Sequence, residues 1–501
     1  MSGQGIEVSA TREARRTGLV LAAACVCQVM VVLDVSVVNV ALPSIASSLD
    51  FSAGSLSWVV NAYVLVFGGL LLLGGRFADL VGHRAAMFVG LAMFGVASVL
   101  GGFSRTPGEL IAARAGQGVA GAVLAPLSLT VIMVTFPEGK ARSRAIGIWS
   151  MVSAGGSALG VLLGGLLTEW LSWRWVLFVN VPIVVVAALL GARSVRAARP
   201  TYVRRLDVVG AVLVTVAVSA LVNGTILAGE HGWGTVGVLV SFTVAVVVGA
   251  GFAWWELRGT TTPLVRFGVF RSRSVWVANV IVVFIGAATI AGFYFASLFL
   301  QNVLRYTPLQ AGAAFLPFCI GTVIGAMTST RLAARIGTRT VMSAGLALGA
   351  IGMFLFSRLH ADSTFLNGFL LPSVVASVGV GLCMVANTTL GTTGAAEHEA
   401  GLVSGLLNAC RQCGGSIGLA ALTAVAVSAT NHSGTSTATQ ALVNGYDRAF
   451  LVTAGFALVA ALVAALFAPS APRVRDGSAP ASDDPRGNTV TPTDSGVAAT
   501  D

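Results

Sequence analysis

Fourteen long apolar runs, separated by short stretches rich in charged residues, proline or glycine, make up most of the chain. A helix needs about 20 apolar residues to cross the hydrocarbon core of a bilayer. Each run is therefore predicted to form one transmembrane helix. The predicted spans are 17–40, 56–73, 85–103, 108–134, 145–168, 174–192, 207–228, 235–256, 275–300, 311–330, 340–357, 365–388, 402–427 and 448–467.

The composition supports an all-α integral membrane protein. The chain is 55% hydrophobic and 10% charged, whereas soluble domains average about 25% charged residues. The net charge of +10 does not indicate a nucleic-acid partner, because the basic residues are scattered singly through short loops. Lys140 is the single lysine among the 30 basic residues. That bias toward arginine points to a GC-rich coding genome, and so to a bacterium.

The basic residues also predict the orientation of the chain. Most of them fall in the loops that share a membrane side with the two termini, and only a few fall in the alternate loops, namely Arg105, Arg174, Arg305, Arg358 and Arg448. Cytoplasmic loops carry the excess of basic residues in membrane proteins. We therefore expect a multi-pass protein of the plasma membrane with both termini in the cytoplasm.

Two loop segments indicate an internal repeat. Arg76-Phe-Ala-Asp-Leu-Val-Gly-His-Arg84 follows the second span, and Arg331-Leu-Ala-Ala-Arg-Ile-Gly-Thr-Arg339 follows the tenth. Gly155-Gly-Ser157 and Gly414-Gly-Ser416 occupy corresponding places in spans 5 and 13. Repeats of this kind predict two six-helix bundles with two further helices between them. The predicted parts are a cytoplasmic N-terminus (1–16), an N-terminal bundle (17–200), two linker helices (201–272), a C-terminal bundle (273–467) and a disordered cytoplasmic tail (468–501).

Asp34 lies within the first apolar run and is the one acidic residue in the interior of the predicted spans, where two arginines, Arg114 and Arg411, also lie. A carboxylate at the centre of a bilayer costs about 2.5–3.5 kcal/mol on insertion scales. Two interpretations explain such a residue. It is either a buried group that holds neighbouring helices together, or a proton-binding site of a transporter. We favour the proton-binding site because few other charges share its surroundings.

Several motifs resemble the major facilitator superfamily, and within it the drug:proton antiporters with fourteen spans. They are Leu33-Asp-Val-Ser-Val-Val-Asn-Val-Ala-Leu-Pro43, Gly75-Arg-Phe-Ala-Asp-Leu-Val-Gly-His-Arg84, Arg114-Ala-Gly-Gln-Gly118 and Trp173-Arg-Trp-Val-Leu-Phe-Val-Asn-Val-Pro182. The resemblance covers nearly the whole chain outside the tail. The chain departs from the family in span 5, where Val161 replaces the usual proline, and in the loop motif, where His83 replaces a basic residue.

The resemblance implies roles for particular residues. Asp34 and Arg114 would couple transport to protons, because an opposite charge favours the ionised carboxylate and burial favours the neutral one. A permanent ion pair is the alternative. The loop motif would latch the two bundles through Gly75, Asp79, Gly82 and Arg84. Span 5 would supply a hinge at the bundle interface through Gly156, Gly160, Gly164 and Gly165, although close helix packing explains these glycines equally well.

Polar and aromatic residues in the cavity-facing spans are candidates for cargo binding, although each could instead form a hydrogen bond between helices. They are Asn39, Asn61, Tyr63, Gln117, Asn279, Tyr294, Asn387, Asn408, Arg411 and Gln412. Because the spans carry two arginines and one acid, we expect a neutral or weakly acidic cargo rather than a dication.

The remaining features narrow the function. The chain has no phosphate-binding loop of the G-x-x-x-x-G-K-[ST] type, so we expect the proton gradient to supply the energy, with no cofactor. The five histidines fall in loops or at helix ends, and no metal site is predicted. We therefore predict a monomeric transporter, not an enzyme, that exports hydrophobic small molecules such as an antibiotic in exchange for protons. An exporter or importer of a metabolite is the alternative.

Overall fold

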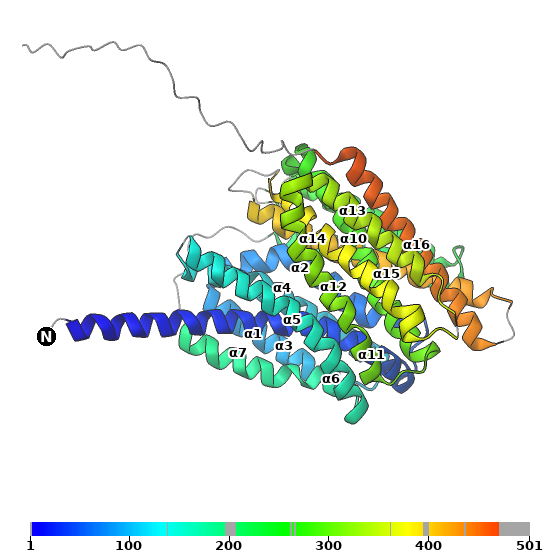
Figure 1. Cartoon of the computed structure of the whole chain (residues 1–501), viewed down its shortest axis with the longest axis horizontal. Coiled ribbons are helices and arrows are strands. Elements are labelled where there is room, and N and C mark those ends of the chain that lie inside the picture. Colours follow the sequence, from blue (N-terminus) through cyan, green and yellow to red (C-terminus); the bar gives the residue numbers. More distant parts are fainter. Residues whose placement is uncertain are drawn as a thin grey trace, which may run out of the picture. The chain divides into compact units, whose positions relative to one another are not determined.

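The computed structural model describes residues 3–137, 139–195, 207–260, 263–264, 267–360, 362–393, 400–434 and 437–469. All regular elements in these ranges are helices, as Figure 1 shows. Fourteen helices of the described part are long and apolar enough to cross a membrane. This confirms the predicted all-α class and number of spans. The tail predicted to be disordered lies outside the described residues from residue 470 onward.

The helices follow one another with short connections. In chain order they are α1 (Gly3–Leu49), η1 (Ser55–Ser57), α2 (Trp58–Val81), α3 (His83–Gly102), α4 (Pro107–Thr135), α5 (Lys140–Trp170), α6 (Trp175–Phe178), α7 (Asn180–Ser194), α8 (Val208–His231), α9 (Val236–Trp254), η2 (Trp255–Gly259), η3 (Phe267–Arg271), α10 (Arg273–Leu298), η4 (Phe299–Val303), α11 (Pro308–Ala314), α12 (Leu316–Ile336), α13 (Thr338–Phe356), η5 (Phe365–Phe369), α14 (Leu370–Thr393), α15 (Ala400–Asn431) and α16 (Ala438–Phe467).

Several spans are longer than the apolar runs predicted. The first candidate span covers Arg16–Leu49 and the last covers Ala438–Phe467, against predictions of 17–40 and 448–467. The predicted ranges stopped at polar residues, whereas a helix continues past the hydrocarbon core for as long as its backbone hydrogen bonds are kept. As a consequence Asp447 lies inside the last span, which corrects the expectation that Asp34 is the one acid in the interior of the spans.

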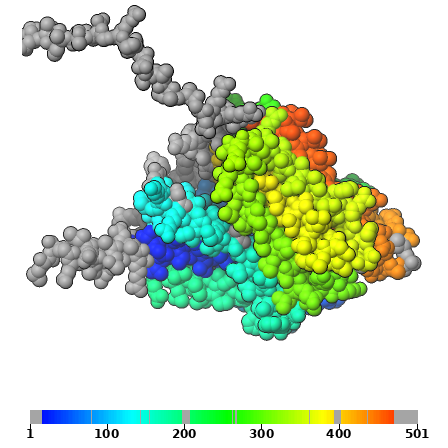
Figure 2. Space-filling view, viewed as in Figure 1, coloured from blue at the N-terminus to red at the C-terminus, as the bar shows by residue number. Residues whose placement is uncertain are grey.

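Helices α1–α7 pack with one another, and so do α10–α16. In Figure 1 the first set runs from blue to teal and the second from green to red. Helix α8 packs against α2 of the first set and α15 of the second, and α9 packs against α8. The linker helices therefore lie beside the seam between the two bundles. Figure 2 shows the surfaces of α5 and of α11–α12 meeting along this seam.

The bundles also touch at one end of the spans. We call the membrane side on which α1 begins the terminal side and the opposite side the distal side. At the distal side the Ser297 hydroxyl of α10 donates to the backbone carbonyl of Asn39 in α1 at 2.7 Å. The backbone N–H of Leu309 in α11 donates to the Glu169 carboxylate of α5 at 3.0 Å. These contacts hold the distal ends of the bundles together.

The repeat predicted from the two loop segments has a structural counterpart. Gly82 separates α2 from α3 with φ 88° and ψ 142°, and Gly337 separates α12 from α13 with φ 87° and ψ 147°. The arginine two residues further on also behaves alike in both halves. Arg84 donates to the carbonyl of Val195, and Arg339 to that of Ala465. Each arginine therefore binds the end of the sixth span of its own bundle, where a helix C-terminus attracts a cation.

The two turn glycines give a test of this backbone conformation. Their φ and ψ values lie close to a region that is essentially restricted to glycine and costs other residues about 1–3 kcal/mol. We expect Gly82→Ala and Gly337→Ala each to lower the melting temperature of the purified protein by a similar amount. Gly455→Ala, on α16 with open space around its Cβ, is the control and should not lower it. An unchanged melting temperature in both turn variants would contradict this account.

Candidate functional site

Asp34 is completely buried inside the N-terminal bundle, and Arg114 is 1% exposed. The Arg114 Nη1 lies 2.5 Å from the Asp34 Oδ2. The other carboxylate oxygen accepts hydrogen bonds from the Gln117 amide at 3.0 Å and from the Asn180 amide at 2.8 Å. The carboxylate is thus held by side chains from α4 and α7. It faces neither lipid nor open solvent.

Arg114 has further contacts that hold its guanidinium in place. Its Nε donates to the carbonyl of Val59 in α2 at 3.0 Å, and its Nη1 donates to Gln117 Oε1 at 2.8 Å. Its Cζ lies 4.6 Å from the ring centroid of Tyr63, within the range of a cation–π interaction. The Gln117 amide also donates to the Ser98 hydroxyl of α3 at 2.8 Å. Five helices therefore contribute to the Asp34 cluster, which we define as Asp34, Ser98, Arg114, Gln117 and Asn180 with the ring of Tyr63.

Local sequence explains how two of these side chains are positioned. Helix α4 begins with Thr106, whose hydroxyl accepts from the Glu109 N–H at 3.3 Å, and with Pro107 in the first turn. This start places Arg114 two turns into the helix. Helix α7 carries Pro182 in its first turn, where proline is tolerated, and the helix therefore starts at Asn180 beside the carboxylate.

The hydrogen bonds are those of an ionised carboxylate. Each neighbour of Asp34 donates to it, and a carboxylate that only accepts is deprotonated. Burial of the two charges is offset by their mutual attraction and by the additional hydrogen bonds. Removing one partner of such a pair costs about 3–5 kcal/mol, because the other charge is left uncompensated. The cluster is therefore stable in this conformation only as a complete set.

Two members of the cluster were not predicted as functional from the sequence. Asn180 lies in a motif that was recognised, but nothing in the motif shows that its amide reaches a carboxylate 146 positions earlier. Ser98 is a small hydroxyl in an apolar span, which is a common feature of helix packing. The signal that could have found Asn180 is that an isolated amide in an apolar run needs a polar partner.

The loop motif is formed as a turn, and its arginine contacts its own bundle. Arg84 Nη1 lies 3.5 Å from the carbonyl of Val195. Gly75 faces Pro126 of α4, where a Cβ would make an ordinary contact at 3.8 Å. Asp79 lies in α2, but its side chain is outside the described part of the structure. The role of Gly75, Asp79, Gly82 and Arg84 as a latch between bundles stays a prediction.

The glycines of α5 lie on two different contacts. A Cβ at Gly160 would lie 2.7 Å from the Ser36 Cβ of α1, and a Cβ at Gly164 would lie 2.7 Å from the Val37 carbonyl. Gly156 also faces α1, beside Val29. Gly165 instead faces α11, where a Cβ would lie 2.5 Å from the Pro308 carbonyl. Close packing therefore explains Gly160, Gly164 and Gly165, whereas a Cβ at Gly156 would make an ordinary contact at 3.6 Å. The role of all four as a hinge stays a prediction.

The predicted cavity residues separate by exposure. Tyr63 and Gln117 belong to the Asp34 cluster. Asn39, Asn61, Asn279, Tyr294 and Asn387 are buried, and each has at least one polar atom without a partner among the described residues. Asn408 is exposed, and Arg411 Nη2 donates to its Oδ1 at 3.3 Å. Gln412 lies against Gly68 of α2, at the crossing of α2 and α15. Their roles in cargo binding stay predictions.

The exposed amide of Asn408 indicates which side of the seam is open to water. The Asn408 amide donates to the Ser404 carbonyl at 3.2 Å, and its exposed position beside the Arg411 guanidinium would be costly against lipid, so we infer that Asn408 faces an aqueous space. It lies near the start of the span Leu402–Asn431, toward the terminal side. Asn408 is thus on the side opposite the contacts that hold the distal ends of the bundles together.

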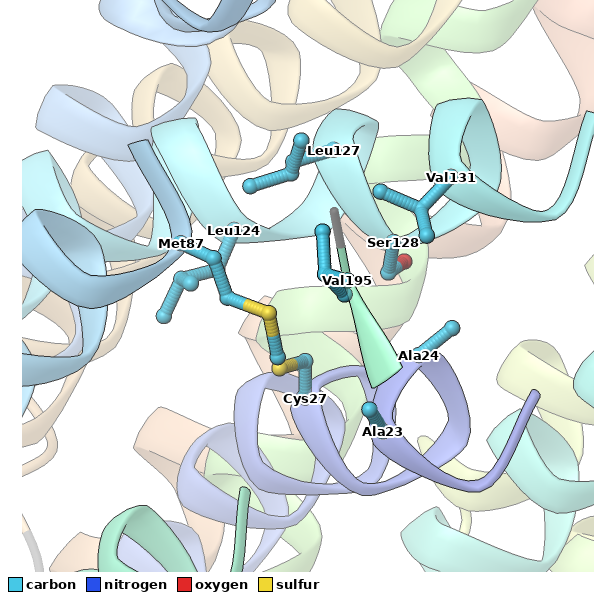
Figure 3. A pocket seen from close by; sticks show the side chains of 9 residues that line it. All are labelled: Ala23, Ala24, Cys27, Met87, Leu124, Leu127, Ser128, Val131 and Val195. Atoms are coloured by element: carbon cyan, nitrogen blue, oxygen red, sulfur yellow. The ribbon is translucent and has the colours of Figure 1, made fainter. Parts of the chain in front are cut away.

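The bundles contain small apolar pockets, which are distinct from this space. Figure 3 shows one inside the N-terminal bundle, between α1, α3, α4 and the end of α7, lined by Ala23, Ala24, Cys27, Met87, Leu124, Leu127, Ser128, Val131 and Val195. A second lies between α10, α13, α14 and α16, which are the corresponding spans of the C-terminal bundle. Neither pocket has more than one hydroxyl in its lining, and neither adjoins Asp34.

Comparison with known proteins decides the family. A sequence model described as the Major Facilitator Superfamily matches residues 24–419. The chain belongs to the major facilitator superfamily. It is therefore a multi-pass membrane transporter and not an enzyme.

Characterised relatives are similar over most of their length. The cephamycin export protein CmcT of Amycolatopsis lactamdurans is 41% identical over 89% of this chain and 91% of its own. The puromycin resistance protein pur8 of Streptomyces alboniger is 40% identical over 87% and 88%. The tetracenomycin C resistance and export protein of Streptomyces glaucescens is 35% identical over 80% and 74%.

A solved structure supports the fold of this superfamily member. A bacterial homologue of the human lysosomal transporter Spinster, in an inward-facing and unoccupied conformation, aligns with a TM-score of 0.66. The alignment covers 90% of this chain and 97% of that one at 16% identity. At this identity the likeness shows the fold alone.

The packing of α5 on α1 can be tested with matched alanine variants of this transporter. Gly164→Ala places a methyl group against the Val37 carbonyl, whereas the Cβ at Gly155 meets nothing within 4 Å. We expect Gly164→Ala to force the helices apart and to cost about 1–3 kcal/mol, the typical cost of overpacking. Gly155→Ala should leave stability unchanged. Equal melting temperatures of the two variants would refute this explanation of the glycines.

Asn180 gives a second test, because it was found only from the structure. Asn180→Ala removes one donor from the ionised Asp34, and a hydrogen bond to a charged group contributes about 1.5–3 kcal/mol. The folded protein loses this contribution, so we expect Asn180→Ala to lower the melting temperature of the purified protein.

Asn223→Ala is the matched control. The Asn223 amide donates to Ser241 within the linker helices at 3.0 Å, far from the Asp34 cluster. This hydrogen bond joins two neutral groups, so we expect Asn223→Ala to lower the melting temperature by less than Asn180→Ala. Equal losses in the two variants would contradict a hydrogen bond from Asn180 to a charged carboxylate.

Proposed function

We propose that this protein exports hydrophobic small molecules, such as an antibiotic, across the plasma membrane in exchange for protons, with Asp34 as the proton-binding residue. The observation that carries the proposal is the complete burial of Asp34 in a span, with Arg114 paired to it. The relatives named for cephamycin, puromycin and tetracenomycin C support the class of cargo. The proton gradient is the energy source, and no cofactor takes part.

The positive-inside pattern supports a cytoplasmic terminal side, and we infer that the conformation with the distal ends in contact is the one that faces the cytoplasm. In this state Asp34 is ionised and Arg114 is fully engaged. A proton taken up from the distal side would neutralise Asp34 and weaken its hold on Arg114, because only the charged form attracts the guanidinium strongly. Release of that proton to the cytoplasm would restore the arrangement seen here. Asp34 therefore has a well-defined ionised state from which a cycle can start.

The energetics allow useful efflux with one proton. Moving one elementary charge through about 100 mV yields roughly 2.3 kcal/mol. Since each 1.4 kcal/mol corresponds to about a tenfold ratio, one coupled proton supports roughly fortyfold accumulation of a neutral cargo. A second coupled proton is not required.

The charges near the aqueous space support a neutral or weakly acidic cargo. The Asp34 carboxylate is occupied by its three side-chain donors and has no exposed surface. The charged side chain beside the exposed Asn408 is Arg411, a cation. Asp447 lies nearer the distal end of α16, and the other acids within the candidate spans, Glu109, Glu169, Glu230 and Glu256, lie near span ends. Unpartnered polar atoms on Asn39, Asn279, Tyr294 and Asn387 are candidates to form hydrogen bonds with the cargo when the bundles move.

Transport in proteoliposomes tests the proposal. Asp34→Asn keeps the shape of the side chain but removes its ability to ionise. We expect the wild type to accumulate a cephamycin, which is acidic, against a concentration difference when a pH gradient is imposed, and Asp34→Asn to lose this accumulation. Exchange of labelled for unlabelled compound without a gradient should persist in the variant, because cargo binding does not require the proton.

Asp362→Asn, which changes an exposed acid, is the control and should behave as the wild type. Accumulation that survives both collapse of the gradient and the Asp34→Asn change would rule out proton coupling through this residue. Transport of a lipophilic dication that depends on Asp34 would instead contradict the expected charge of the cargo. Transport of a metabolite in place of every antibiotic tested would favour the alternative function.

A further inference from the structure

Pro43 interrupts the hydrogen bonding of α1 near its distal end. Proline has no backbone N–H, so the carbonyl four residues earlier, that of Asn39, receives no hydrogen bond from within the helix. In a membrane each such carbonyl needs another partner, because the hydrocarbon region contains no water. The sequence of α1 therefore creates one carbonyl that must be satisfied from outside the helix.

The partner comes from the other bundle. The Ser297 hydroxyl of α10 donates to the Asn39 carbonyl at 2.7 Å. The Gln301 amide, in the π-helical turn η4 that continues α10, donates to the next carbonyl, that of Val40, at 2.8 Å, and to the Ser297 hydroxyl at 3.2 Å. Ser297 is completely buried. Both donors thus reach the stretch of α1 that Pro43 has left short of hydrogen bonds.

Ser297 donates to a carbonyl of the opposite bundle, whereas the buried Ser329 donates to Leu382 within its own bundle at 2.8 Å. A serine or threonine in a helix commonly donates to the carbonyl three or four residues before it. Ser194 does so to Leu190 at 2.7 Å, and Thr453 to Ala449 at 2.7 Å. Ser297 instead donates across the seam between the bundles. Its hydroxyl therefore contributes to the contact between bundles and not to the helix that carries it.

We propose that Pro43, Ser297 and Gln301 form a distal bolt, in which the carbonyl released by the proline is bound by the opposite bundle only while the distal side is closed. When the distal side opens, α10 moves away from α1 and water must replace Ser297 at the Asn39 carbonyl. The bolt stabilises the closed arrangement through neutral hydrogen bonds. In the open state water can bind the same carbonyl, so that no backbone group is left without a partner. Ser297 and Gln301 act by holding α1 against α10, and these hydrogen bonds must break before the distal side can open. The bolt rests on the alternating opening of the proposed transport cycle, but not on the identity of the cargo or on protons.

A second contact, between α5 and α11, limits the expected effect of losing the bolt. The Glu169 carboxylate binds the Leu309 N–H, and Gly165 packs against the Pro308 carbonyl. Removing the bolt should therefore loosen the distal closure and not abolish it. Loss of one neutral hydrogen bond changes such an equilibrium roughly fivefold, which is a measurable change in the population of the open form.

The test measures the distance between spin labels on the two bundles in the full-length protein, without cargo and at one pH. Labels are attached at Ser47→Cys in α1 and at Ala438→Cys in α16, both exposed distal positions, after replacement of the six native cysteines. Ser297→Ala is expected to raise the ratio of the long to the short distance roughly fivefold. Ser297→Thr, which keeps the hydroxyl, should restore the original ratio.

A double-mutant cycle separates the bolt from an ordinary packing contact. In Pro43→Ala the new N–H can bind the Asn39 carbonyl within α1, so the carbonyl no longer depends on Ser297. We expect Ser297→Ala to have little further effect in that background, whereas independent contributions would add. Ser194→Ala, whose hydroxyl bonds within its own helix, is the matched control and should leave the distances unchanged.

Either of two results would overturn the proposal: Ser297→Ala leaves the distance ratio as in the wild type, or the effects of Pro43→Ala and Ser297→Ala add. Where Ser297→Ala fails to fold, Gln301→Met removes the neighbouring donor and is judged by the same ratio. Because no cargo and no pH gradient are used, a shift in distances supports the bolt even if the protein exports no antibiotic. Failure of antibiotic transport alone would count against the proposed function and not against the bolt.

Discussion

The absence of water from the hydrocarbon core is the constraint on which this structure depends. Each polar group placed there must find a protein partner, because an unsatisfied backbone or side-chain group costs several kcal/mol in lipid. Asp34 meets this requirement through Arg114, Gln117 and Asn180. The Asn39 carbonyl meets it through a serine of the other bundle. The hydrogen bonds of Asp34 stay inside the N-terminal bundle. The hydrogen bond to the Asn39 carbonyl joins the two bundles, so it exists only while they are close together.

The two halves share the same arrangement of helices but carry different polar residues. The turns at Gly82 and Gly337 have nearly the same dihedral angles, and the arginine after each turn binds the sixth span of its own bundle. Small apolar pockets lie between corresponding spans of both bundles. The network around Asp34, by contrast, is built on helices of the N-terminal bundle alone. A repeat of the scaffold therefore allows the N-terminal half to carry the buried ion pair, while Ser297 and Gln301 of the other half supply neutral donors to α1.

The sequence was sufficient to predict the features that depend on local pattern. Apolar run length predicts the spans, and the turn glycine at position 82 follows from a motif whose backbone conformation suits glycine alone. The pairing of Asp34 with Arg114 could be predicted because two opposite charges in apolar runs have few other partners. Contacts that depend on how the helices rotate and approach one another could not be predicted from the sequence. Asn180 and Ser297 are ordinary polar residues in sequence, and only the packing of distant helices shows what each one binds. Asp447 was missed for another reason, since the helix continues beyond the polar residues at which an apolar run ends.

Helix α1 links the proposed proton site to the distal contact, because it carries both within three turns. Asp34 fixes one face of the helix to α4 and α7, and Leu33, Ser36 and Val37 pack on the glycines of α5. The carbonyl released by Pro43 lies on the same rigid element. A proton on Asp34 would weaken the hold of α4 on α1, and any small rotation or shift of α1 would then move this carbonyl away from its donor on α10. Coupling across a protein requires an element with two arrangements that both sites can bias. A helix bound at one point by charge and at another by a hydrogen bond between bundles is such an element, and it needs no direct contact between proton and cargo.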